Sequence, residues 1–211
     1  MNIDKAIQSA IECRRKGDLK HTEYLCQKIL KKKPHHPDIL NMLGELFCLF
    51  ENFDLAIKYL RKALQFRPTD IAGAYCNLGR ALAEKGHLDE SMTYSQKAIE
   101  LRPSFAEAYC NLGYAFLKKG LLDEATTYAQ KAIKLNPSFA QAYCNLGRAL
   151  AEKGQLNEAI TYAQKAIELN PSFARAYYNL GYTLLEKGQL DGAMTYYQKA
   201  IELNPSFANA H

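Results

Sequence analysis

Apolar positions recur along the chain with the spacing of helical faces. Tyr75, Leu78 and Leu82 stand at i, i+3 and i+7, which places their side chains on one side of a helix. A second face of the same kind follows after a short polar interruption, at Leu88, Ser91, Ser95, Ala98 and Leu101. The pattern therefore predicts two consecutive amphipathic helices.

The residues around these two faces predict a helical hairpin. Lys85 and Gly86 supply a turn between the helices, and Asp89 places negative charge at the start of the second one, where the helix dipole is positive. Pro103 ends the second helix, because proline has no backbone N–H to donate.

The hairpin signals repeat along the chain with a period of 34 residues. A period of this size indicates stacked supersecondary units. The sequence predicts one array over 1–211, made of six hairpins at 3–36, 37–70, 72–105, 106–139, 140–173 and 174–207, with 208–211 starting a truncated seventh unit. Ile71 is an inserted residue, which predicts a longer loop or a changed packing angle between the second and third hairpins.

Small residues at fixed positions predict close contact between helices. Glycine inside a helix is unfavourable by about 1 kcal/mol relative to alanine, so Gly79, Gly113, Gly147 and Gly181 need a packing reason. The first unit departs from the pattern, with Ser9, Ala10 and Cys13 at its small and apolar positions, and is expected to be a polar cap.

The pattern Tyr-x-x-Leu-Gly-x-x-Leu, followed by two alanines and a proline, resembles the tetratricopeptide repeat (TPR). The resemblance covers nearly the whole chain. It implies an all-α, right-handed α-solenoid of six TPR hairpins whose first helices line a concave face. It also implies a non-catalytic scaffold that binds an extended peptide or a partner protein on that face.

Composition limits the other function classes. The chain has 48% hydrophobic and 23% charged residues, no apolar run long enough for a membrane span and no signal peptide, so a soluble cytoplasmic protein is expected. The net charge of +5 comes from residues 1–36, with nine basic and four acidic residues, whereas 37–211 hold eighteen of each. The even balance predicts no nucleic-acid partner, and the run of lysines at 31–33 is interpreted as a solvated helix end.

Cysteines and histidines give no indication of a cofactor. The six cysteines form no C-x-x-C pair and are expected to be reduced. Equal spacing by one hairpin does not bring ligands to one point, so no metal site is predicted. No nucleophile pattern or phosphate loop occurs, which predicts that the chain is not an enzyme.

The sixth position of the last four hairpins is always asparagine: Asn77, Asn111, Asn145 and Asn179. This series resembles the asparagine ladder in the repeat domain of O-linked N-acetylglucosamine transferase, and the resemblance implies that the amides grip a peptide backbone. Structural hydrogen bonds to a neighbouring hairpin are the alternative interpretation. The resemblance also leaves open that the chain is the N-terminal recruiting region of a larger enzyme, such as a bacterial glycosyltransferase.

Two further rows complete the predicted peptide-binding residues. Arginine and tyrosine alternate at Arg80, Tyr114, Arg148 and Tyr182, either as binding anchors or as stacked pairs that tie hairpins together. The residues before the asparagines form a moderately apolar strip of Cys76, Cys110, Cys144 and Tyr178. The lysines and asparagines of the carboxylate clamp found in TPR co-chaperones are missing from these positions, so that function is not predicted.

The end of the chain predicts self-association. The last hairpin should lack a covering helix, which would leave Tyr197, Ile201, Leu203 and Phe207 partly open to water. Association through the C-terminal end is therefore expected. A purely structural oligomerisation module is the third function class that the sequence allows.

Overall fold

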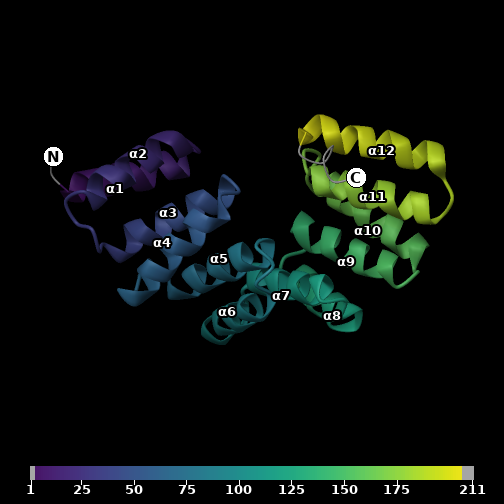
Figure 1. Ribbon diagram of the computed structural model, residues 1–211, viewed down its shortest axis with the longest axis horizontal. Helices are drawn as coiled ribbons and strands as arrows, with labels where there is room; N and C mark the ends of the chain where they lie inside the picture. The colour runs from purple at the N-terminus through teal and green to yellow at the C-terminus, as the bar shows by residue number, and fades with distance from the viewer. Residues whose placement is uncertain (1–2, 206–211) are drawn as a thin grey trace. The chain divides into compact units, whose positions relative to one another are not determined.

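The computed structural model describes residues 3–205, which form twelve α-helices and contain no strand (Figure 1). The chain divides into two compact units, residues 1–103 (unit 1) and 104–211 (unit 2). Unit 1 contains α1 (Ile3–Arg15), α2 (Leu19–Leu30), α3 (Pro37–Leu49), α4 (Phe53–Gln65), α5 (Ile71–Glu84) and α6 (Leu88–Leu101). Unit 2 contains α7 (Ala106–Lys118), α8 (Leu122–Leu135), α9 (Ala140–Glu152), α10 (Leu156–Leu169), α11 (Ala174–Glu186) and α12 (Leu190–Leu203).

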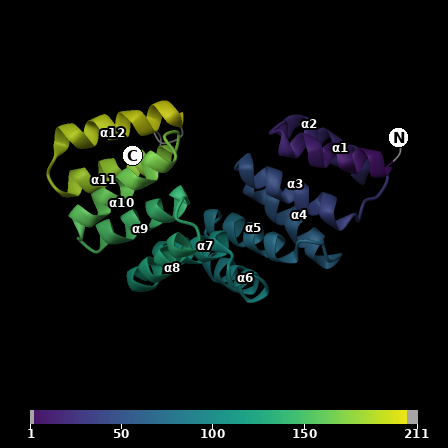
Figure 2. The same ribbon diagram turned by 180° about the vertical axis from the view of Figure 1, so that it is seen from behind.

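Consecutive helices pair as hairpins in both units. Each odd-numbered helix packs closely on the even-numbered helix that follows it, as the views from the front and from behind show for α3 with α4 and α11 with α12 (Figures 1 and 2). Within each unit, the second helix of one hairpin then packs on the first helix of the next. The predicted all-α array of helical hairpins is confirmed.

The turns inside the hairpins need a left-handed residue. Gly86 occupies this position in the third hairpin with a φ of 81°, a conformation that glycine adopts without a steric penalty. The second hairpin has Glu51 at the corresponding position, with a φ of 56°. A residue with a Cβ is strained in this conformation, so the turn of the second hairpin is destabilised relative to the glycine turns of the other hairpins.

Close helix contact explains the glycines inside the first helices. A Cβ added to Gly147 would lie 3.1 Å from the carbonyl oxygen of Ala159 and 3.2 Å from the backbone nitrogen of Ala163. Both atoms belong to the backbone of the second helix and cannot rotate away. The predicted packing role of these glycines is confirmed.

The second helix of the third hairpin buries most of the face that the sequence predicts. Ser91, Ser95 and Ala98 are fully buried, but Leu101 is 58% exposed, so the prediction is wrong at that residue. Leu101 is the last residue of α6, and at Arg102 the backbone leaves the helix with a φ of −140°. The helical periodicity therefore no longer directs this side chain into the core.

Side-chain caps fix the start of several helices in unit 1. Asp18, Asn52 and Asp70 each accept a hydrogen bond from the backbone N–H three residues later. Because Asp70 caps α5, this helix begins at Ile71, one residue earlier than the expected unit boundary. The inserted residue lies in the first turn of α5, and residues 66–70 connect it to α4.

Polar bridges of one type join neighbouring hairpins within each unit. A lysine at the end of a first helix reaches an acceptor at the start of the preceding second helix. In unit 1, Lys85 Nζ lies 3.0 Å from a carboxylate oxygen of Asp54. In unit 2, Lys153 Nζ lies 2.7 Å from Asp123, and Lys187 Nζ donates to the Asn157 amide oxygen at 2.7 Å. These bridges link adjacent hairpins at the surface, and each contributes little stability.

The cysteines and the C-terminal hairpin complete the fold. All six cysteines are free, and five of them are buried. Tyr197, Ile201 and Leu203 are half-buried on α12, and Phe207 lies outside the described residues. Among residues 3–205, no helix combines the length and apolar character that crossing a membrane requires.

Candidate functional site

The first helices of unit 2 bring most of the predicted binding residues onto one surface. Helix α9 packs against both α7 and α11, so equivalent positions of the three helices lie in rows. Tyr114, Arg148 and Tyr182 form one such row, and all three side chains are half-buried. We call this surface, carried by α7, α9 and α11, the first-helix face of unit 2.

Arg148 is held in place from two directions. Its guanidinium carbon lies 4.0 Å from the centre of the Tyr182 ring, which is stacking distance. Its Nε donates a hydrogen bond of 2.6 Å to the Glu152 carboxylate, one turn further along α9. The stacked pair that the sequence left as an alternative is therefore present, and it fixes the orientation of the guanidinium group.

Arg175 also belongs to this face, although the sequence did not indicate it. Its guanidinium carbon lies 5.3 Å from the centre of the Tyr114 ring, two hairpins earlier, and Lys118 Nζ lies 5.7 Å from the same ring. One feature of the sequence could have indicated Arg175. The second residue of the first helix differs between hairpins whose neighbouring residues are nearly the same: it is Glu107, Gln141 and Arg175.

The asparagines of unit 2 bond to the preceding hairpin. Asn145 and Asn179 are 4% and 6% exposed. Their Nδ2 groups donate to the backbone oxygens of Cys110 and Cys144 at 3.3 and 3.2 Å, and Gln141 Nε2 donates to Asn145 Oδ1 at 3.0 Å. These amides join adjacent first helices.

The row of cysteines lies beneath this surface. Cys110 and Cys144 are 1% and 0% exposed. Burial raises the pKa of the Cys144 thiol to about 12, although Arg175, a hydrogen bond from Asn179 and Arg148 each lower it. Tyr178, the last member of the row, is half-buried, and its ring centre lies 5.4 Å from that of Tyr197.

Unit 1 places Asn77 and Arg80 on α5, and both are half-buried. Arg80 lies beside Cys48 of the preceding hairpin, where burial raises the pKa of the thiol and the arginine partly opposes this shift. The buried Nε of Arg80 has no hydrogen-bond partner among the described residues. Cys76, on the same helix, is 3% exposed.

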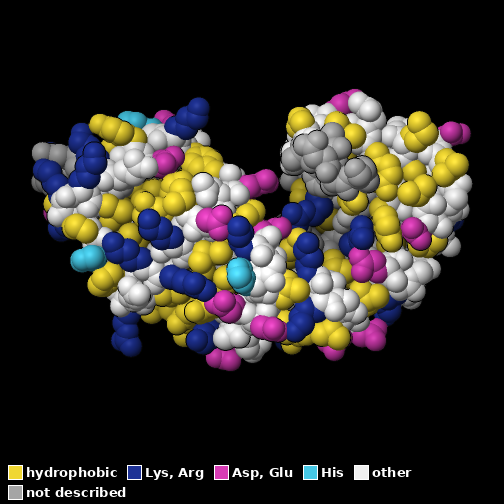
Figure 3. Space-filling model, viewed as in Figure 1, with side chains coloured by type: hydrophobic (Ala, Val, Ile, Leu, Met, Phe, Trp, Pro, Cys, Tyr) yellow, Lys and Arg dark blue, Asp and Glu magenta, His cyan; other side chains and the backbone are white. Residues whose placement is uncertain are grey.

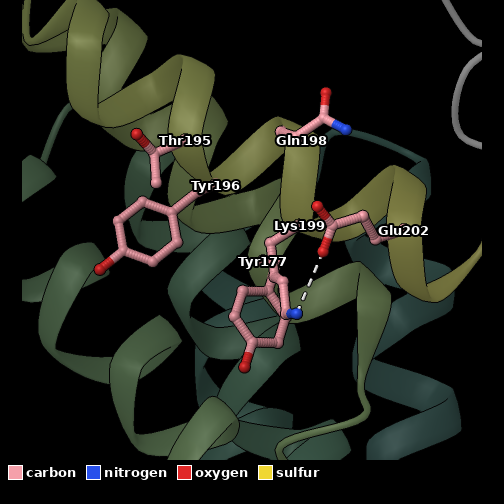
Figure 4. Close-up of a pocket in the computed structure, with 6 residues that line it drawn as sticks. All are labelled: Tyr177, Thr195, Tyr196, Gln198, Lys199 and Glu202. Atoms are coloured by element: carbon pink, nitrogen blue, oxygen red, sulfur yellow. Dashed lines mark hydrogen bonds and ion pairs between the residues drawn. The ribbon is translucent and has the colours of Figure 1, made fainter.

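A separate hollow of about 420 Å³ lies on α11 and α12, lined by Tyr177, Thr195, Tyr196, Gln198, Lys199 and Glu202 (Figure 4). Its Tyr177 and Tyr196 rings lie 6.3 Å apart, and Lys199 Nζ is 3.1 Å from Glu202. Similar tyrosine pairs recur at the same positions in the three preceding hairpins. The hollow is therefore the solvent-exposed side of a tyrosine pair that recurs in each of these hairpins.

Among residues 104–205, the charged side chains do not gather into a group that could hold a metal ion. Acidic and basic side chains are interspersed on the visible face of unit 2 (Figure 3). Within the part of the chain that the structure describes, no group of three or more histidine, cysteine or acidic side chains could hold a metal ion. The first-helix face instead offers stacked cations, tyrosine hydroxyls and a layer of small buried residues, which suits contact with another chain.

The repeated helical hairpins and the rows of side chains on the first helices are typical of α-helical repeat proteins that act as interaction scaffolds. The family model described as "Tetratricopeptide repeat" matches residues 23–71, 110–172 and 144–206, and the model "TPR repeat" matches 79–120. The chain therefore belongs to the tetratricopeptide repeat family.

Similar proteins cover different shares of the chain. A peroxisomal targeting signal receptor of Eremothecium gossypii is 38% identical over 69 residues, which are 33% of this chain and 12% of the receptor. The crystal structure of MamA is 30% identical, with 79% of this chain and 97% of MamA covered and a TM-score of 0.56. The structure of YrrB, a TPR protein with an unusual peptide-binding site, is 25% identical, with coverages of 85% and 92% and a TM-score of 0.53.

Proposed function

We propose that this chain is a scaffold that binds an extended peptide segment of a partner protein along the first-helix face of unit 2. The observation that carries the proposal is the half-exposed row of Tyr114, Arg148 and Tyr182, in which stacking already orders the arginine. Tyrosine and arginine are frequent anchors of protein interfaces, and side chains ordered before binding lose less entropy on binding.

The asparagine and cysteine rows have a supporting role in this proposal. Asn77 is half-buried, and its amide can offer both a donor and an acceptor to a peptide backbone. Asn145 and Asn179 already donate to neighbouring carbonyls, so they act mainly by holding the surface in shape. The small buried cysteines allow the first helices to approach closely beneath the peptide.

The description of YrrB as a TPR protein with a peptide-binding site supports a peptide ligand, and the description of the peroxisomal protein as a receptor supports recognition of a targeting signal. Both are similarities to other proteins, so they support the class of ligand and do not identify one. The alternative of a recruiting region in a larger glycosyltransferase rests on the asparagine series alone, and the relatives described above add nothing to it.

A selection from a random dodecapeptide library, followed by titration of synthetic peptides, tests the proposal. Replacing Tyr114 and Tyr182 by alanine should weaken binding of the selected peptides by about tenfold or more. The matched control is Tyr24→Ala, which removes a 54% exposed tyrosine from the second helix α2. Equal affinity of both variants and the wild type would contradict the proposal.

Self-association through the C-terminal hairpin is a second proposal, favoured by two exposed apolar side chains on α12. Leu190 and Met194 are 59% and 70% exposed, whereas the equivalent Leu156 and Ile160 of α10 are half-buried. Sedimentation over a hundredfold concentration range should show a dimer that Met194→Glu abolishes. A constant monomer mass for the wild-type chain would refute this proposal.

A further inference from the structure

The second helices of the hairpins share a pattern of charge that α2 reverses. The second residue of these helices is aspartate in α4, α6, α8 and α12 and asparagine in α10, whereas α2 has Lys20. The thirteenth position, counted from the start of the helix, is Glu168 in α10 and Glu202 in α12, whereas the first hairpin has Lys31 there. The first hairpin therefore carries a positive side chain at two positions where carboxylates recur.

Helix stability does not account for Lys20. The start of a helix carries a partial positive charge, so an aspartate there is favourable and a lysine is unfavourable. The first turn of α2 has no acidic residue, whereas the first turns of α4, α6, α8, α10 and α12 each have at least one. Packing does not account for Lys20 either, because this side chain is exposed. Recognition of an anionic ligand would account for it.

One face of α2, which we call the basic α2 face, carries Lys20, Tyr24, Lys28 and Lys31. Positions i, i+4, i+8 and i+11 fall within about a quarter turn of a helix, and all four side chains are exposed. The opposite side of the helix is buried through Thr22, Leu25, Cys26 and Ile29. At a rise of about 1.5 Å per residue, the basic α2 face is about 16 Å long.

No carboxylate among the described residues neutralises these lysines. Between residues 3 and 205, no ion pair involves Lys20, Lys28 or Lys31. The lysines equivalent to Lys28 in α10 and α12 pair with the glutamate three residues later, at 2.9 and 3.1 Å. Lys31 occupies the position of that glutamate, so this pair cannot form in the first hairpin.

The acidic side chains that lie close to this face in the sequence have other partners. Glu23 accepts a hydrogen bond of 2.8 Å from Gln27 Nε2. Asp18 accepts one of 3.1 Å from the backbone N–H of His21 and thereby caps α2. The basic α2 face is thus open to a carboxylate from another chain.

Tyr24 orders the centre of the face. Lys28 Nζ lies 3.5 Å from the Tyr24 hydroxyl oxygen and 5.5 Å from the centre of its ring. Tyr24 is 54% exposed, and its hydroxyl accepts from Lys28, so the hydroxyl proton can be donated to a ligand carboxylate.

We propose that the basic α2 face binds an acidic segment of a partner polypeptide. An extended chain advances about 3.3 Å per residue, so about five residues cover the face. Successive side chains of such a chain point to opposite sides, so residues at alternate positions can place carboxylates on the lysines. This inference goes beyond the proposed function, because the face lies on a second helix of unit 1.

Other anionic ligands fit the face less well. A nucleic acid requires a basic stripe that follows its phosphate backbone, but on the next second helix of unit 1 Asp54 stands at the position of Lys20. A membrane surface requires apolar side chains that insert beside the basic ones, and among residues 19–30 Tyr24 is the only large apolar side chain that is exposed. A short acidic peptide needs neither feature.

Fluorescence anisotropy with defined peptides tests the inference. The probe is a labelled decapeptide of alternating glutamate and serine, and its neutral counterpart has glutamine in place of glutamate. The wild-type chain should bind the acidic peptide at least about tenfold more tightly than the neutral one at low ionic strength, and added salt should reduce the difference.

The variant Lys20→Asp/Lys31→Glu gives the first hairpin the charges that recur in the other second helices, so it should fold and lose the preference for the acidic peptide. Lys131→Asp/Lys134→Glu is the matched control, because it makes the same change in charge at two exposed positions of the second helix α8. This control should bind both peptides as the wild type does. Lys20→Arg/Lys31→Arg keeps the charge and should keep the preference.

Each other result would overturn the inference. Equal affinity of the wild type for the two peptides would do so, as would a preference that the control variant loses equally, because net charge alone would then be recognised. Single-stranded decathymidylate or phosphatidylserine vesicles that bind through Lys20 and Lys31, without binding of the acidic peptide, would also overturn it. Peptides that depend on Tyr114 and Tyr182 should bind Lys20→Asp/Lys31→Glu unchanged, so the proposed function is tested separately.

Discussion

Replacing Ser91 by alanine should stabilise unit 1. Ser91 and Ser95 are fully buried on α6, and neither hydroxyl has a hydrogen-bond partner among the described residues. The other hairpins of the same pattern carry alanine at the position of Ser91, for example Ala125 and Ala159. The fold therefore does not require a hydroxyl at this position.

The magnitude follows from the loss of hydration. A buried polar group without a partner destabilises a protein by about 1–3 kcal/mol, and alanine also has a higher helix propensity than serine. A hydroxyl in a helix can rotate toward the carbonyl of the preceding turn, which favours the lower end of this range. We expect Ser91→Ala to raise the free energy of unfolding by about 1 kcal/mol.

Urea unfolding followed by circular dichroism at the helical band measures the change. The midpoint should rise while the slope with urea stays constant. Thr22→Val is the matched control, because Thr22 occupies the same position in the first hairpin but its hydroxyl donates a 2.7 Å hydrogen bond to the Asp18 carbonyl. This variant should lower the midpoint. If both substitutions shift the midpoint in the same direction, the hydroxyl at Ser91 is not the destabilising group.

Two further substitutions test other features of the fold. Glu51→Gly should raise the free energy of unfolding by about 1 kcal/mol in thermal melting, because the residue has a φ of 56°, whereas Gly86→Ala at a φ of 81° should lower it. A destabilised Glu51→Gly variant or a stabilised Gly86→Ala variant would contradict the strain argument. The pKa of the Cys144 thiol is raised by burial from the ordinary 9.0 to about 12, so above pH 9 the unfolded chain loses this proton first and stability falls as pH rises toward 12. Between about pH 8 and pH 10.5, the free energy of unfolding from urea titration should fall less steeply with pH for Cys144→Ala than for the wild type, by up to about 1.4 kcal/mol per pH unit. Identical slopes would contradict the raised pKa of Cys144.

The hairpins could be predicted from sequence because few residues encode them and the code is local. A glycine such as Gly147, the alanine that faces it and a proline after the second helix determine the packing of each pair. The start of α5 at Ile71 could not be predicted in this way, because it depends on a side-chain cap that the other hairpins of the pattern lack. Asp70 accepts the Gly73 N–H and takes the helix one residue earlier than the repeat implies.

Only part of the candidate site could be predicted from the sequence. The row of Tyr114, Arg148 and Tyr182 follows directly from the repeat, since positions separated by one period lie next to each other. The contact between Arg175 and Tyr114 joins residues two hairpins apart, and its reach depends on how adjacent hairpins of unit 2 rotate. The exposure of the asparagines was equally hidden, because their hydrogen bonds use backbone carbonyls that no sequence pattern marks.

The two copies of AYCNLGRALAEKG show why neighbours decide the chemistry of a repeat. Arg148 stacks on Tyr182 of the following hairpin and donates to Glu152. Arg80 has the same local sequence, including a glutamate one turn later, yet it lies against Cys48 and leaves its Nε without a partner among the described residues. The same thirteen residues thus present a guanidinium group stacked on a tyrosine ring in one unit and a guanidinium group beside a buried thiol in the other. Duplication of a hairpin pair therefore copies the fold, while the residues that the adjacent hairpins supply determine the surroundings of each copied side chain.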